Sequence, residues 1–76
     1  MPTLRNVSGE ECIKILCNRF GFRVARKRGS HVVLRKEALN GPVGTVVPLH
    51  KQLKIGTLKD ALELAKVDEA EFARFL

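Results

Sequence analysis

The chain has 76 residues, of which 45% are hydrophobic, and its formal net charge is +6. This length fits one small domain, residues 1–76, because a chain of this size buries only about 60% of its unfolded surface and leaves no room for a cofactor-binding domain. No apolar run approaches the roughly 18 residues that cross a membrane, and residues 1–12 lack the basic-then-apolar order of a secretory signal. We therefore expect a cytoplasmic protein that is not membrane-bound and has no cofactor.

The positive charge is concentrated in one part of the chain. Residues 12–36 contain eight basic residues and no acidic residue, whereas residues 57–76 contain three basic and five acidic residues. Such an uneven field attracts a polyanion to one side of a molecule, and nucleic acid is the commonest such partner. The alternative is a charged face that only keeps the protein soluble. An imbalance this large favours nucleic acid.

The first predicted element is a helix that begins after Ser8. Ser8 and Glu11 have the spacing of a capping box, and Gly21 stands where a left-handed glycine ends a helix. An apolar stripe at helical spacing lies between them: Ile13, Leu16, Cys17 and Phe20. This stripe assigns Cys17 to the core and makes Cys12 incidental.

Three strands are expected next. Residues 22–28 and 31–36 alternate in polarity around Gly29-Ser30, a glycine-first pair typical of a type II′ hairpin. A buried face is expected from Phe22, Val24, Val32 and Leu34, which leaves His31 and Lys27 together on the open face. Residues 37–44 predict a loop. Residues 45–49 predict a third strand, which either ends at Pro48 or lies at a sheet edge.

Two more helices complete the predicted fold. Thr57 is the expected N-cap of the second helix, whose apolar stripe spans residues 58–65, and Asp68 restarts a short terminal helix. The order αβββα plus a terminal helix predicts an α+β fold. Two helices then pack on one face of a three-stranded antiparallel sheet, and the other face stays open to solvent or a ligand.

His31 is the candidate catalytic residue. A lone histidine is more often structural, but His31 is expected on the open face, directly after a tight turn and beside Lys27, Arg28 and Arg35. Imidazole transfers protons near neutral pH. Cleavage of RNA without a metal needs a base for the 2′-hydroxyl and a cation for the charge that develops on the phosphate. A histidine in a basic hairpin can supply both.

The remaining candidates are RNA-binding residues. His50 follows the third strand and would form a two-histidine site only if the fold brings it to His31, which the sequence leaves open. The sequence contains no phosphate-binding loop, nucleophile elbow, metal-site spacing or clustered carboxylates, so no metal site is predicted. The predicted phosphate-binding residues are Lys27, Arg28, Ser30, Arg35, Lys36 and His50.

Several segments together resemble the HicA family, also called YcfA-like, of toxins from HicA–HicB toxin–antitoxin pairs. The resemblance covers nearly all of residues 8–76 and depends on the order and spacing of its pieces, not on any one of them. The chain departs from the family in an acidic extension at residues 67–76 and a longer loop at residues 37–42. The matching segments are Arg19-Phe-Gly-Phe22, Arg28-Gly-Ser-His31, Val47-Pro-Leu-His50 and Leu53-Lys-Ile-Gly-Thr-Leu58.

The resemblance implies a double-stranded-RNA-binding-domain-like αβββα fold and cleavage of mRNA by an endoribonuclease, an mRNA interferase, with His31 as the catalytic histidine. It also implies a HicB-type antitoxin that covers the active face. The alternative is a non-catalytic module that binds double-stranded RNA by shape. A third alternative is an adaptor with no affinity for polyanions. The RNA sequence preference and the oligomeric state stay open.

Overall fold

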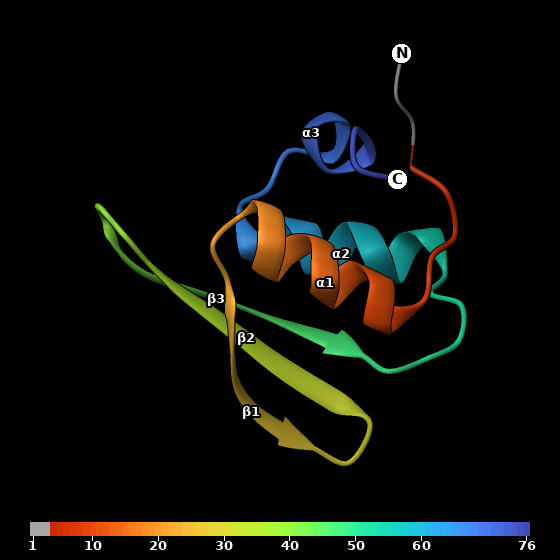
Figure 1. Ribbon diagram of the computed structural model, residues 1–76, viewed down its shortest axis with the longest axis horizontal. Helices are drawn as coiled ribbons and strands as arrows, with labels where there is room; N and C mark the ends of the chain where they lie inside the picture. The colour runs from red at the N-terminus through yellow and green to blue at the C-terminus, as the bar shows by residue number, and fades with distance from the viewer. Residues whose placement is uncertain (1–3) are drawn as a thin grey trace.

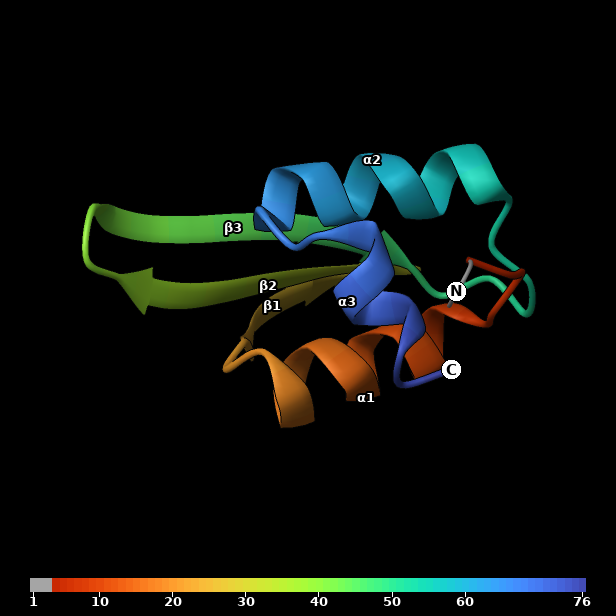
Figure 2. The same cartoon turned by 90° about the horizontal axis from the view of Figure 1, so that it is seen from above.

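A computed structural model describes residues 4–76 of the chain, so residues 1–3 of the predicted domain lie outside the described part. Its three strands form one antiparallel sheet in the order β1-β2-β3. The helices α1 and α2 cover one face of this sheet, and α3 lies over them on the side away from the sheet (Figures 1 and 2). In chain order, the elements are α1 (Gly9–Arg19), β1 (Arg23–Arg28), β2 (His31–Ala38), β3 (Gly41–Pro48), α2 (Ile55–Ala65) and α3 (Glu69–Ala73).

This architecture confirms the predicted α+β fold, which is double-stranded-RNA-binding-domain-like with a short C-terminal helix. Within residues 4–76, no helix is long and apolar enough to span a bilayer. The core lies between the sheet and the helices and includes Leu16, Leu34, Val47, Leu62 and Phe72.

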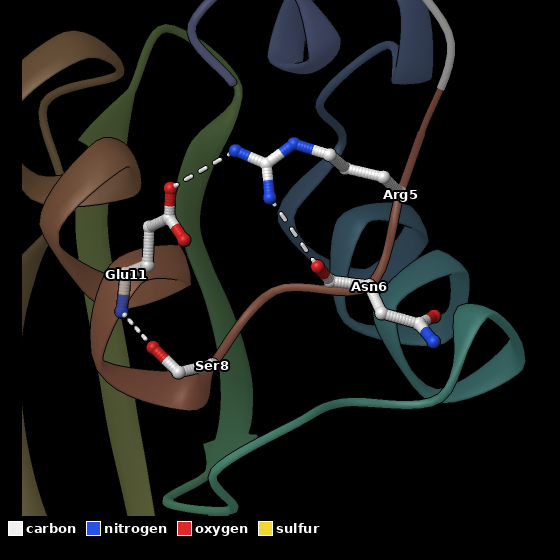
Figure 3. Close-up of polar contacts among 4 residues, drawn as sticks. All are labelled: Arg5, Asn6, Ser8 and Glu11. Atoms are coloured by element: carbon white, nitrogen blue, oxygen red, sulfur yellow. Dashed lines mark hydrogen bonds and ion pairs between the residues drawn. The ribbon is translucent and has the colours of Figure 1, made fainter.

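The caps of α1 follow the predicted chemistry. The Ser8 hydroxyl accepts a hydrogen bond of 3.0 Å from the Glu11 amide, while the Glu11 carboxylate pairs with Arg5 at 3.6 Å (Figure 3). Gly21 adopts a φ of +79°, which glycine reaches without strain, and the Phe22 amide then returns to the Leu16 carbonyl at 3.1 Å. Local sequence therefore sets both ends of this helix.

The buried face of α1 differs from the prediction. Cys12 is fully buried, whereas Cys17 is only partly buried, so the predicted roles of the two cysteines were wrong. The reason is that α1 has two apolar contacts, one with the sheet and one with α3. Phe20 packs against the α3 region, with its ring centroid 6.4 Å from that of Phe72 and 5.7 Å from that of Phe75. A single helical stripe cannot describe a helix packed on two sides.

The two thiols should therefore differ in reactivity. Burial, together with the nearby Glu11 carboxylate, raises the pKa of the Cys12 thiol to about 12, and burial also raises the pKa of Cys17. Because the thiolate is the nucleophile, we expect Cys17 to react with iodoacetamide at pH 8 at least about tenfold faster than Cys12. Peptide mass mapping over time measures both rates, and equal rates in the folded protein would contradict this packing. Denaturation should remove the difference.

The β2–β3 connection is a long hairpin and not the predicted loop. β2 continues to Ala38 and β3 begins at Gly41, so only Leu39 and Asn40 form the turn. Gly41, the first residue of β3, has a φ of +113°, a conformation that glycine adopts without strain. Pro42 is tolerated because β3 is an outer strand. The hairpin extends beyond the helices (Figure 1).

The start of α2 is also shifted. The helix begins at Ile55, and its N-cap Lys54 makes no side-chain capping bond, so the predicted cap Thr57 lies inside the first turn. The predicted apolar stripe is confirmed, since Leu58, Ala61, Leu62 and Ala65 are buried. The buried Thr45 hydroxyl donates to the Ala61 carbonyl at 2.7 Å and joins β3 to α2. The Asp68 side chain caps α3, as predicted, by accepting from the Glu71 amide at 3.1 Å.

Candidate nucleic-acid interface

His31 begins β2 and is exposed on the face of the sheet that no helix covers. Along β2, Val32 and Leu34 are buried under the helices, whereas His31 and Arg35 are exposed. Successive side chains of a strand point to opposite faces, so His31 and Arg35 belong to the open face. The structure therefore places the imidazole where the sequence placed it.

A β-bulge changes which basic residues accompany His31. The register shifts between Val24 and Arg26, after which Arg28 lies opposite His31 and Lys27 lies opposite Val32. Because directly opposed residues share a face, Arg28 belongs to the open face and Lys27 to the helix side. The prediction that Lys27 and His31 share the open face was wrong, since one extra residue at Ala25 reverses the alternation. Val24 lies opposite Leu34 on the helix side but is 54% exposed, so the prediction that it is buried was wrong, because β1 is an outer strand with few contacts to the helices.

The same bulge brings Arg26 onto the open face, where it lies opposite Val33. Arg23 lies opposite Arg35 at the far end of β1. Arg35 is half exposed, and its Nε is 3.5 Å from the Glu37 carboxylate, so part of its charge is balanced. Within residues 4–76, none of the β1 arginines has a carboxylate partner. We call Arg23, Arg26, Arg28, His31 and Arg35 the basic face.

Lys36 is held on the opposite side of the sheet. It follows the alternation of Leu34, and its Nζ donates to the Phe20 carbonyl at 3.1 Å. The same ammonium lies 4.9 Å from the centroid of the Phe22 ring. These contacts join β2 to the end of α1, so Lys36 is separated from His31 by the sheet and does not belong to the basic face.

Ser30 and His50 meet His31 at one end of the sheet. The Leu49 amide donates to the Ser30 carbonyl at 2.6 Å, and Pro48 lies opposite His31. The next residue, His50, is exposed, and its carbonyl accepts from the Gly9 amide at 2.9 Å. The β1–β2 turn, the end of β3 and the start of α1 therefore converge here. The main chains of His31 and His50 therefore lie at the same end of the sheet, and a two-histidine site stays a prediction.

A cluster of acidic residues lies among the helices α2 and α3, away from the basic face. An open groove of about 940 Å³ is lined by α2 and α3 residues that include Asp60, Glu63, Asp68 and Glu69. The basic face and this groove thus separate the charge across the fold, which orients an approaching polyanion toward the sheet. Within the described residues, no group of three or more His, Cys, Asp or Glu side chains is arranged to hold a metal ion.

The sequence model of one family, described as the HicA toxin of bacterial toxin–antitoxin systems, matches residues 9–67 of the chain. The chain belongs to the HicA toxin family. The match runs from the first residue of α1 to just beyond α2, and α3 follows it. No curated protein and no solved structure shows a significant match. Membership makes this HicA-family chain the toxin component of a toxin–antitoxin system and implies an antitoxin partner.

Two arginines of the HicA-family chain were missed by reading its sequence. Counting alternate residues forward from Phe22 places Arg26 on the helix side, but counting back from the Gly29-Ser30 turn pairs Arg28 with His31 and places Arg26 on the open face. The two counts disagree by one residue. A two-residue hairpin fixes its register from the turn, so this disagreement was the available signal for the bulge and for Arg26. For Arg23, the sequence offers no signal of a place on the open face other than its positive charge.

Proposed function

We propose that this HicA-family toxin is a metal-independent endoribonuclease, an mRNA interferase, in which His31 is the general acid or base. The proposal is carried by one observation: the exposed His31 lies directly opposite Arg28 in the β1–β2 strand pair, on a face with no covering helix. A face of this kind suits an extended polymer. Because the substrate would be mRNA, we expect the protein to act in the cytoplasm.

The proposed reaction uses the ribose of the substrate. His31 accepts the proton of a 2′-hydroxyl, whose oxygen attacks the adjacent phosphorus. The bond from phosphorus to the 5′-oxygen breaks, and the products are a 2′,3′-cyclic phosphate and a 5′-hydroxyl. Arg28 stabilises the charge that develops on the phosphate oxygens. The departing 5′-oxygen takes a proton from water or from His50, which the fold brings to the same end of the sheet.

We assign RNA binding to the basic face and to two residues beside it, Ser30 and Lys27. Arg26, Arg28 and Arg35 line the strands next to His31, while the Ser30 hydroxyl stands at the turn. Lys27 is exposed at the edge and reaches phosphate from the other side of β1. The antitoxin implied by the family is proposed to be a HicB-type protein that covers the basic face and therefore presents acidic groups to it.

RNA incubation in EDTA tests this function. We expect the purified chain to cut single-stranded RNA with EDTA present and to leave 5′-hydroxyl ends, because the reaction needs no metal. DNA of the same sequence should bind and stay intact, since it lacks the 2′-hydroxyl. End labelling with polynucleotide kinase, with and without phosphatase, identifies the ends. Cleavage of the DNA, or loss of RNA cleavage in EDTA, would overturn the mechanism.

The rival function is a non-catalytic module that binds double-stranded RNA, which the αβββα fold favours. Both functions predict RNA affinity that falls with salt. They differ in the products, since a binding module leaves the RNA intact at every protein concentration. Intact RNA together with measurable binding would select the rival.

A further inference from the structure

Two basic residues of α1 have no role in the proposed nuclease site. Residues 12–36 contain eight basic residues. Four of these belong to the basic face, Lys27 lies beside it, and Lys36 is held on the helix side of the sheet. The remaining two, Lys14 and Arg19, are exposed on α1. Their charges therefore face solvent on a different surface of the molecule.

Lys14 and Arg19 line an open groove between α1 and the end of the chain, which we call the α1–α3 groove. It has a volume of about 390 Å³, and the exposed residues Asn18 and Arg74 also line it. Figure 2 shows α3 and the residues after it beside α1. Among residues 4–76, no acidic side chain lines this groove. Its three cations therefore attract an anion.

The three cations of the α1–α3 groove have no partner of opposite charge. Within residues 4–76, no side-chain carboxylate lies within ion-pair distance of them, and neither does the terminal carboxylate of Leu76. Glu10 and Glu71 lie one helical turn before Lys14 and Arg74 but do not pair with them. The positive charge of the groove is thus available to a ligand.

An aromatic ring orients one of these cations. The Arg19 Cζ lies 5.1 Å from the centroid of the Phe75 ring, which packs edge-on against Phe20 with a centroid separation of 5.7 Å. Phe75 remains 41% exposed. RNA bases stack on aromatic rings and on arginine planes, and the Asn18 amide can both donate to and accept from a base edge. Stacking surfaces between cations suit a nucleotide better than a protein carboxylate.

We propose that the α1–α3 groove binds a nucleotide of the RNA that is cleaved at His31, several nucleotides away from the cut. Lys14 and Arg74 bind its phosphates, and its base stacks on Arg19 and Phe75. This assignment rests on the proposed function, because it takes RNA as the ligand. The family match ends at residue 67, so the α3 side of the groove lies outside the matched segment.

The distance between the groove and the basic face suits a single strand of RNA. Four residues of β2 separate His31 from Arg35, which is about 13 Å along a strand. Arg35 lies opposite Arg23, and the four-residue step from Arg19 to Arg23 spans at most about 14 Å. At about 3.4 Å per stacked nucleotide, the whole path corresponds to about eight nucleotides. A shorter RNA reaches the basic face alone.

Binding of uncleavable RNA of two lengths tests the groove. 2′-O-methyl RNA keeps the phosphates and bases but has no 2′-hydroxyl proton to lose. In the full-length chain, we expect Lys14→Gln with Arg74→Gln to weaken binding of an RNA of about 16 nucleotides by about tenfold, or roughly threefold per cation. The slope of log affinity against log salt should fall by about 1.4. Binding of an RNA of about six nucleotides should change less than about twofold.

Lys59→Gln with Lys66→Gln is the matched control, since it removes the same charge from exposed positions on the α2 side. It should leave the difference between long and short RNA unchanged. Equal losses in the two double variants, or no loss in the groove variant, would overturn the proposal. A groove variant that loses binding to polyglutamate and not to RNA would assign the groove to an acidic protein and overturn it too.

Phe75→Leu tests the stacking separately from the charge. We expect this variant to bind the long RNA at least about fivefold more weakly, because base stacking on an aromatic ring is lost. The salt slope should stay at the parent value, since no cation is removed. Parent affinity in this variant would overturn the base contact.

Cleavage kinetics distinguish a failure of the groove from a failure of the nuclease function. On long RNA, the groove variant should raise KM and leave kcat unchanged, because the groove lies away from the reacting atoms. Cleavage of the short RNA should match that of the parent. If RNA is cut but the KM for long RNA does not rise, the groove proposal is wrong and the nuclease function stands. If no form cuts RNA, the nuclease function is wrong, and the binding experiment still decides the groove.

Discussion

Replacing His31 by alanine is expected to lower the rate of RNA cleavage by about 10²- to 10⁴-fold, the usual contribution of a general acid or base. RNA affinity should change little, because the phosphate contacts proposed for Arg26 and Arg28 do not involve the imidazole. The melting temperature should also stay close to that of the parent chain, since an exposed side chain on an uncovered face contributes little packing. Cleavage kinetics on a labelled RNA, with binding measured on DNA of the same sequence, separate these quantities.

His50→Ala is the matched control for that experiment. If His50 donates the proton to the departing oxygen, its loss should reduce cleavage by about 10²-fold or more. If water supplies that proton, the rate should stay within a few-fold of the parent. Either result leaves His31 as the proposed base. Unchanged cleavage by the His31→Ala protein would end the mechanism, and a collapsed melting temperature would assign His31 a structural role.

The largest effect on stability is expected at Gly9, the first residue of α1. An added Cβ would overlap the Pro48 carbonyl oxygen and lie 3.0 Å from the Leu49 Cα. Main-chain atoms cannot rotate away, so Gly9→Ala must separate α1 from the end of β3. We expect a loss of about 3 kcal/mol, at the upper end of overpacking costs. That loss is a fall in melting temperature of roughly 15 °C for a domain of this size.

Gly56→Ala is the control, because Gly56 is also in the first turn of a helix. An added Cβ there meets nothing within 4 Å, so alanine should stabilise the protein by about 0.5–1 kcal/mol. Thermal denaturation followed by circular dichroism measures both variants. Similar behaviour of the two would show that the contact between Gly9 and β3 yields easily. If His50 is the proton donor, a Gly9→Ala protein that stays folded should also cleave RNA more slowly, since the Gly9 amide holds the His50 carbonyl.

Features set by local chemistry were predictable from the sequence. The Ser8 and Asp68 caps, the left-handed Gly21 and the α2 stripe each depend on residues within one or two helical turns of each other. The exposed position of His31 followed from the alternation along β2. The first-turn position of Thr57 was missed because Lys54 caps α2 without a side-chain bond, which leaves no residue type to identify the start.

Features set by tertiary contacts were not predictable in the same way. Cys12 is buried because α1 is covered on two sides, and α3 provides the second cover from more than fifty residues away. Lys36 was assigned to RNA by its charge, but its Nζ finds the Phe20 carbonyl and the Phe22 ring. The sequence positions of charged residues do not distinguish a cation that is exposed to solvent from one that packs against other residues of the protein.

The bulge at Ala25 makes the surface beside the imidazole depend on strand length as much as on residue type. Deleting that one residue would restore an uninterrupted ladder while the turn still paired Arg28 with His31. Val24 would still lie opposite Leu34 and Arg23 opposite Arg35, so each side chain would keep its face of the sheet. Deleting Lys27 instead would use up the extra residue from the turn side, which moves Arg26 to the helix side and puts Ala25 on the open face. Loss of one codon should thus be tolerated at the bulge, whereas between the bulge and the turn it should remove a cation from this surface.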